Sequence, residues 1–154
     1  MNANEIIDFC SYVIQKSKFA YLTTINENGT PETRAMLNLY NREQYPKLKS
    51  VLNLDNHQIY FTTNTSSDKI NQIINNPKSC VYFIIEDEWK GVMFNGKIEI
   101  ETDIERKKEI WQDEWVAYGT KDYLDPDYSI LKLSAEYIKG WTGNQKTELK
   151  TSNL

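Results

Sequence analysis

The stretch IYFTTNTSSDKINQIINNP, residues 59–77, is the part of the sequence that most directly decides the fold. A short apolar run typical of a β-strand passes into hydroxyl and amide side chains, and a helical pattern then begins. Three isoleucines follow at the spacing of one helix face, and a proline ends the segment: Ile70, Ile73, Ile74 and Pro77. We therefore predict a strand followed directly by a helix, with Ser66 or Ser67 as the N-cap residue.

This junction also carries the donors that a phosphate group requires. The first backbone N–H groups of a helix have no partner within the helix, and they lie at the positive end of the helix dipole. The side chains that could add to them are Thr62, Thr63, Ser66, Ser67 and Lys69. From these residues alone two interpretations stay open, namely a phosphate site and the commoner ordinary helix cap.

Length and composition indicate one globular domain with a hydrophobic core of ordinary size. The 154 residues are 40% apolar and 26% charged, and the net charge of −4 argues against nucleic-acid binding. No apolar run approaches the roughly 20 residues that span a bilayer, and no signal-peptide pattern is present, so we expect a cytoplasmic protein. Cys10, Cys80 and the single histidine, His57, do not have the spacing of a metal site. We expect His57 to be exposed at a turn.

Most of the remaining segments have strand patterns separated by turns. Strands are predicted at Phe19–Ile25, Thr30–Tyr40, Gln58–Thr63, Cys80–Glu86, Val92–Glu101 and Ile130–Ile138. The turn at residues 26–29 has Gly29 available for a positive φ, and Gly91 and Gly96 are predicted bulge positions. The strand at 80–86 shows little polar alternation, so both of its faces should be covered.

Helices are predicted around Ile6–Val13, at Ser67–Asn75, and from the cap Asp103 through Trp115. The first of them should begin at a capping pair formed by Asn2 and Glu5. Residues 41–54 are expected to hold one helical turn and a loop. Residues 1–143 should form the domain, with 144–154 as a polar, frayed tail. Short strands linked mostly by turns favour an antiparallel barrel over alternating βαβ units.

Three blocks resemble, in the same order, the FMN-binding split-barrel family related to pyridoxamine 5′-phosphate oxidase. They are FAYLTTINENGTPETRAM (19–36), IYFTTNTSSDKINQIINNPKSCVYF (59–83), and FNGKIEIETDIERKKEIW (94–111), which continues through DPDY (125–128) and LKLSAEYIKGW (131–141). The third block is similar to the smaller general stress protein branch, and only residues 41–56 are poorly covered. The resemblance implies a mainly β (α+β) fold, a six-stranded antiparallel split β-barrel with peripheral helices. It further implies a homodimer that holds FMN in clefts between its subunits.

The resemblance also implies which residues bind the cofactor. They are Arg34, Met36, Leu37, Thr62, Thr63, Ser67, Lys69, Trp111 and Trp141. Among them, Arg34 and Lys69 would offset the phosphate charge, and Met36 with Leu37 would line the isoalloxazine. The alternatives are a solvated Arg34 paired with a carboxylate such as Glu32, and core packing for the apolar and aromatic residues.

The sequence departs from the family pattern at three places. Asp68 stands where the family has an arginine, and we expect its carboxylate to point outward or to cap the helix. Leu39 stands where the oxidases have a lysine, and their C-terminal Arg-x-His element has no counterpart. Oxidation of vitamin B6 phosphates is therefore not expected.

The function implied is an FMN-dependent oxidoreductase with a small-molecule electron donor, such as a reduced nicotinamide, and a small-molecule acceptor. No side chain is singled out as a catalytic acid or base. Two alternatives stay open. One is a flavin-binding or sensing module without turnover, and the other is a dimer that binds a different anionic cofactor, such as another flavin or haem.

Overall fold

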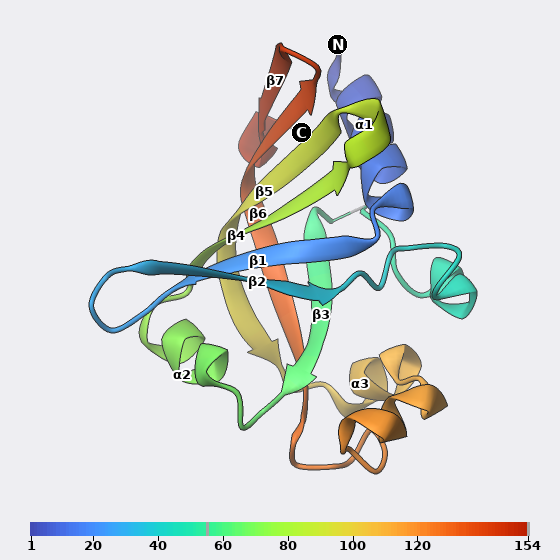
Figure 1. The fold of residues 1–154 in the computed structure, drawn as a ribbon, viewed down its shortest axis with the longest axis vertical. Coiled ribbons are helices and arrows are strands. Elements are labelled where there is room, and N and C mark those ends of the chain that lie inside the picture. Colours follow the sequence, from blue (N-terminus) through green and yellow to red (C-terminus); the bar gives the residue numbers. More distant parts are fainter. Residues whose placement is uncertain (55, 154) are drawn as a thin grey trace.

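The computed structural model describes residues 1–54 and 56–153 of the chain and is drawn in Figure 1. In these residues seven strands form one antiparallel sheet in the order β2-β1-β4-β5-β6-β3, with β7 pairing on β6. The strands are β1 (Phe19–Ile25), β2 (Pro31–Leu37), β3 (Gln58–Asn64), β4 (Lys78–Ile85), β5 (Lys90–Glu101), β6 (Tyr128–Thr142) and β7 (Gln145–Lys150). The end strands β2 and β3 approach each other, but no ladder joins them in the described part. This open half-barrel confirms the predicted split-barrel fold.

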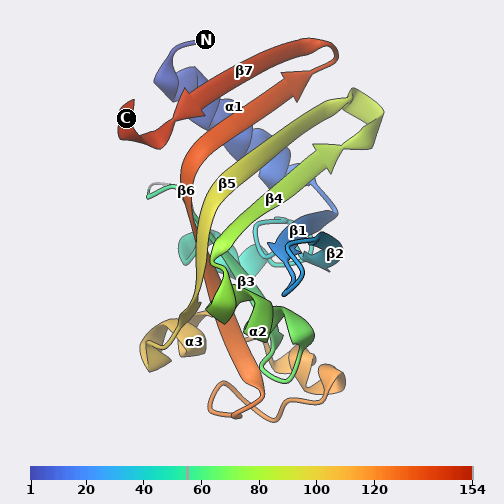
Figure 2. The same ribbon diagram turned by 90° about the vertical axis from the view of Figure 1, so that its left-hand side faces the viewer.

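Helices and short 3-10 turns flank the sheet. They are α1 (Ala3–Lys16), η1 (Pro46–Ser50), α2 (Asp68–Asn75), η2 (Glu86–Glu88), α3 (Ile104–Ile110), η3 (Asp113–Tyr118) and η4 (Thr151–Asn153). Helix α1 lies beside the end of the sheet that carries β7, and α2 and α3 lie at the opposite end (Figures 1 and 2). Within the described residues, none of the helices has the length and apolar character needed to cross a membrane.

Helix α1 begins as its sequence predicts. The Asn2 side chain accepts a hydrogen bond from the Glu5 N–H at 2.9 Å, and the Glu5 carboxylate accepts one from the Asn2 N–H at 2.7 Å. Such a capping box satisfies N–H groups that a helix start leaves unpaired. At the other end, the N–H and the hydroxyl of Ser17 both donate to the Val13 carbonyl. The cap is therefore a local feature that the sequence alone could predict.

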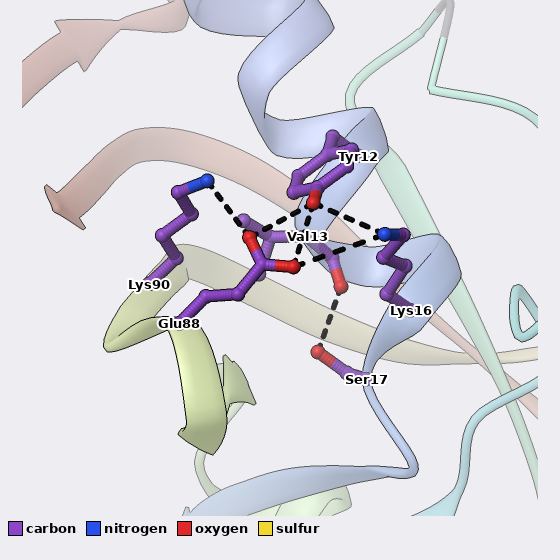
Figure 3. A network of polar contacts seen from close by, with 6 residues as sticks. All are labelled: Tyr12, Val13, Lys16, Ser17, Glu88 and Lys90. Atoms are coloured by element: carbon purple, nitrogen blue, oxygen red, sulfur yellow. Dashed lines mark hydrogen bonds and ion pairs between the residues drawn. The ribbon is translucent and has the colours of Figure 1, made fainter.

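An exposed polar cluster ties α1 to the turn between β4 and β5 (Figure 3). The Tyr12 hydroxyl donates to Glu88 at 2.7 Å, Lys90 pairs with the same carboxylate at 2.8 Å, and Lys16 donates to Tyr12 at 3.1 Å. Exposed charges of this kind add little to stability because solvent screens them. In the same turn, Trp89 adopts a left-handed φ of 51°.

Two glycines occupy positions that require the absence of a side chain. Gly29 has a φ of 78° in the hairpin turn between β1 and β2, as predicted. Gly96 lies at a register shift between β5 and β6, where a Cβ would collide with the carbonyl oxygen of Ser134. The bulge predicted at Gly91 was wrong, because this residue pairs in regular register with Trp141.

Several predictions about the ends of elements were wrong. The strand predicted at Thr30–Tyr40 ends at Leu37, and the strand predicted at Ile130–Ile138 extends over Tyr128–Thr142. The segment expected as a frayed tail forms β7 and η4 in its described part, and Leu154 lies outside the described residues. A polar segment can form an edge strand because the backbone of β6 supplies the hydrogen bonds. The helix that begins at Asp103 ends at Ile110, so Trp115 lies in η3 instead.

One prediction about burial was also wrong. Ile74, assigned to the apolar face of α2, is 65% exposed, because the helix buries Ile70 and Ile73 along a narrower stripe. Within one chain, the core covers one face of β4. Val81 and Phe83 are buried, whereas the alternate side chains on the outer face are half-buried.

Candidate functional site

A cavity of about 370 Å³ opens between the unpaired end strands β2 and β3. It is lined by Ala35, Met36, Leu37, Thr62, Thr63, Asn64, Lys69, Trp115, Tyr118, Thr120 and Tyr128. Five of the nine residues predicted to bind the cofactor are in this lining, namely Met36, Leu37, Thr62, Thr63 and Lys69. The split in the barrel thus brings together residues from β2, β3 and α2 that are distant in the sequence.

Lys69 supplies the positive charge in this lining. Its ammonium donates to the Thr63 hydroxyl at 2.9 Å and to the Ser67 hydroxyl at 3.1 Å. Burial lowers the pKa of Lys69, the nearby Arg34 guanidinium lowers it further, and Asp68 opposes this shift. Ser67, also predicted to bind the cofactor, therefore lies beside the cavity through its contact with Lys69.

Arg34 lies on the inward face of β2, directly beside the residues that line the cavity. The β1–β2 register pairs Leu22 with Arg34 and Thr24 with Glu32, so these four side chains share one face. One Arg34 nitrogen donates to the Thr24 hydroxyl at 2.6 Å and to the Leu22 carbonyl at 3.4 Å. The other donates to the Gln72 side-chain oxygen at 3.3 Å. Burial lowers the pKa of Arg34, and Glu32 opposes this shift.

Neither cation forms an ion pair with a carboxylate of the described residues. Glu32 is exposed, and its hydrogen bond comes from the Gln72 amide at 3.2 Å. Asp68 is exposed and lines a separate cavity beside the β1–β2 turn. This agrees with the expectation that Asp68 points outward. Two cations held close together without a counter-ion favour binding of an anion.

Three backbone N–H groups in the turn just before α2 are already bonded within the chain. The N–H groups of Thr65 and Ser66 donate to the carbonyl and the carboxylate of Asp127, and Ser67 N–H donates to the Asn64 carbonyl. The Asn64 amide also donates to the Asp127 carboxylate, at 2.8 Å. An anion in the cavity would therefore contact side chains and not these three N–H groups. Asp127 lies 61 residues after Ser66, so spacing along the sequence does not indicate this contact.

Aromatic side chains form another part of the cavity lining. Trp115 and Tyr128 are 3% and 2% exposed, and Tyr118 is 62% exposed. Trp111, predicted to bind the cofactor, packs edge-on against Trp115 and Tyr128, with ring centroids 6.0 and 5.0 Å away. Trp111 does not line the cavity but supports the residues that do. The prediction missed Trp115 and Tyr118 because η3 has no pattern that shows which face it turns inward.

Trp141 lies elsewhere in this chain. It packs edge-on against Tyr82 at 6.1 Å and lines a second cavity of about 450 Å³ on the outer face of the sheet. The other predicted residues lie in or beside the cavity between β2 and β3. A single chain therefore does not bring Trp141 to the site.

The histidine and the cysteines lie outside this cavity. His57 was expected to be exposed, but it is half-buried, and its Nδ1 is buried without a partner among the described residues. Its neighbour Asp55 lies outside the described residues.

Burial raises the pKa of Cys10 to about 12, so this thiol stays protonated. The described residues contain no group of His, Cys, Asp or Glu side chains suited to a metal ion.

Residues 6–142 match the model of the pyridoxamine 5′-phosphate oxidase family, whereas comparison with curated proteins gives no match. A Clostridium acetobutylicum protein related to general stress protein 26 of Bacillus subtilis, of the pyridoxinephosphate oxidase family, has a similar solved structure. It is 25% identical with a TM-score of 0.79, and the similarity covers 99% of each chain.

Two further solved structures share the fold at lower identity. A pyridoxamine 5′-phosphate oxidase-related, FMN binding protein of Nostoc punctiforme is 15% identical, with a TM-score of 0.67 over 95% of this chain and 87% of that one. A heme binding protein of Mycobacterium smegmatis is 10% identical, with a TM-score of 0.67 over 94% of this chain and 57% of that one. The family match spans nearly all of the split barrel and the cavity between its end strands. This chain belongs to the pyridoxamine 5′-phosphate oxidase family.

Proposed function

We propose that this chain is an FMN-dependent oxidoreductase. When bound, FMN would supply the redox chemistry by accepting electrons from one small molecule and passing them to another. The chain's own residues would bind the cofactor, orient it and exclude water from it. Oxidation of vitamin B6 phosphates is not part of the proposal, because Leu39, at the position of the oxidases' lysine, is buried in the core.

The residues around the cavity fit the two ends of FMN. Lys69, Thr63 and Ser67 present an ammonium and two hydroxyl groups, and Arg34 lies beside them. A phosphate monoester carries close to two negative charges, which these two cations would offset. The rest of the lining, which includes Met36 and aromatic side chains, suits a planar ring system.

The observation that carries the proposal is the pair of cations without a carboxylate partner at the margin of the cavity. An arginine and a lysine close to each other repel, and burial makes the repulsion stronger. This repulsion raises the free energy of the folded state unless an anion binds between the two cations. A solvated Arg34 paired with Glu32, the alternative expected for a structural arginine, does not occur in this structure.

The absorption spectrum of the purified protein tests the proposal directly. We expect a flavin spectrum, or binding of one added FMN per chain in calorimetry. A colourless protein that does not bind FMN would contradict the proposal. A haem spectrum would also contradict it, and the only histidine in the sequence lies at a different cavity.

One observation favours a second candidate function, in which the chain binds flavin without turnover. The described residues that line the cavity include no carboxylate, histidine or cysteine that could act as an acid, base or nucleophile. Steady-state oxidation of NADH or NADPH by the FMN-loaded protein separates the two functions. Turnover with a common acceptor supports the oxidoreductase, and binding without turnover supports the module.

We also propose that the protein acts as a homodimer with the cofactor cleft between its subunits. The outer face of the sheet carries a half-buried apolar and aromatic surface, brought together by the strand register: Tyr21, Tyr82, Ile84, Met93 and Trp141. The neighbouring Trp89 is 69% exposed. Contiguous apolar and aromatic surfaces commonly mark protein interfaces, and a second copy would cover the same surface on its partner.

Sizing chromatography at dilute concentration tests the dimer. The Met93→Lys variant places a charge in this surface and should shift the protein to a monomer that binds FMN more weakly. Ile74→Lys is the matched control, because it adds the same charge at an exposed isoleucine on α2. A wild-type protein that elutes as a monomer at all concentrations would contradict the dimer.

A further inference from the structure

Gln72 on α2 lies between an arginine and a glutamate that share one face of β2. Glu32 and Arg34 are two residues apart, so their side chains point the same way and are roughly 6–7 Å apart along the strand. Opposite charges in this arrangement ordinarily pair, but here the Gln72 amide contacts both. Its oxygen accepts from Arg34 at 3.3 Å, and its nitrogen donates to Glu32 at 3.2 Å.

Thr24 completes this arrangement from the neighbouring strand. Its hydroxyl is fully buried, donates to the Gln72 oxygen at 2.5 Å and accepts from Arg34 at 2.6 Å. The Arg34 guanidinium is thus held by neutral acceptors, including the Leu22 carbonyl. Its position is fixed while its charge is not cancelled.

A side-chain amide can form hydrogen bonds with both Arg34 and Glu32 at once. Its oxygen accepts from the cation, and its NH₂ group donates to the anion. A carboxylate at position 72 would cancel the charge of Arg34 and repel Glu32. An apolar side chain there would leave Arg34 and Glu32 free to pair with each other.

We propose that Gln72 is a positioning residue that separates Arg34 from Glu32 and keeps the guanidinium available to the phosphate group of the bound ligand. The identity of that ligand as FMN rests on the proposed function. The separation of the two charges rests only on the contacts of this chain. Gln72 does not line the cavity itself, so its effect on the ligand would pass through Arg34.

Calorimetry with FMN and riboflavin on three variants tests this role. Gln72→Met should weaken FMN binding about tenfold, the size of one charge-assisted hydrogen bond, and leave riboflavin binding unchanged. Glu32→Gln alone should change FMN binding by no more than about threefold, because it removes only an exposed charge. The double variant should recover most of the lost FMN affinity, since Arg34 then has no carboxylate to pair with. If Gln72 had only a structural role, Gln72→Met would weaken the binding of both FMN and riboflavin. Adding Glu32→Gln would then restore the affinity for neither ligand.

The crystal structure of ligand-free Gln72→Met separates this inference from the proposed function. We expect an Arg34–Glu32 ion pair in that variant, and the same Arg34 contacts as in the wild type when Glu32→Gln is added. If Arg34 keeps its contact with Thr24 in Gln72→Met and stays apart from Glu32, the inference is overturned. If wild-type protein binds neither FMN nor riboflavin, the proposed function fails, and the ion pair in the variant still decides the role of Gln72.

Discussion

Replacing Lys69 with alanine should weaken the binding of FMN far more than the binding of riboflavin. The Lys69 ammonium lines the cavity and is held by the hydroxyls of Thr63 and Ser67, without a carboxylate partner. A hydrogen bond to a charged group contributes about 1.5–3 kcal/mol, so loss of one phosphate contact should raise the Kd for FMN about 10- to 150-fold. Riboflavin lacks the phosphate and should bind the variant and the wild type equally.

The pH dependence of FMN binding provides a second signature of Lys69. In the free protein its pKa is lowered, first by burial and then by Arg34. A bound phosphate favours the charged ammonium and should raise this pKa again, so binding should take up protons. The FMN affinity of the wild type should therefore fall as pH rises through the lowered pKa of free Lys69. The Lys69→Ala variant should not show this part of the pH dependence.

Isothermal titration calorimetry with both ligands at several pH values measures these effects. Lys47→Ala is the matched control, because it removes an exposed lysine on η1 that does not line the cavity. Thermal unfolding of both variants checks that the fold is intact. An equal loss of affinity for FMN and riboflavin would refute the assignment of Lys69 to the phosphate, as would an unchanged affinity for FMN.

Three further predictions concern the scaffold that positions the site. Gly96→Ala should lower the free energy of unfolding by about 1–3 kcal/mol in denaturant titrations, because its Cβ would meet the Ser134 carbonyl. Gly29→Ala should lower the free energy of unfolding by about 1–2 kcal/mol in the same assay, because a residue with a Cβ is strained at the φ of 78° that Gly29 adopts. An unchanged free energy of unfolding would contradict this argument. Asp127→Asn should destabilise the protein at neutral pH, because hydrogen bonds from Asn64 and Ser66 lower the pKa of the folded carboxyl. That difference from the wild type should shrink as pH falls through the lowered pKa, since protonation then removes the same charge from the wild type; a difference that persists in acid would contradict this origin.

The sequence was most informative where a structure depends on neighbouring residues. The capping box of Asn2 and Glu5, the hairpin turn at Gly29 and the strand–helix junction before Lys69 each involve residues within a few positions. Their hydrogen bonds and dihedral preferences are set locally, so residue types and spacing were enough to predict them. The family resemblance added the split-barrel fold and the candidate cofactor residues.

Tertiary structure decided the features that depend on residues far apart in the chain. The pairing of β3 with β6 brings Asp127 to the N–H groups of Thr65 and Ser66, in the turn just before the helix that was predicted to bind phosphate. The same packing turns Trp115 into the cavity and leaves Trp141 on the outer face of the sheet. Gln72 bridges Arg34 and Glu32 only because α2 packs across the β1–β2 face. By itself the sequence determined the local helices, strands and turns, and the kinds of side chain available at the site. Only the tertiary structure determined which of these side chains contact one another. Contacts between distant segments depend on strand register and on packing in a common core, and spacing along the chain does not encode either.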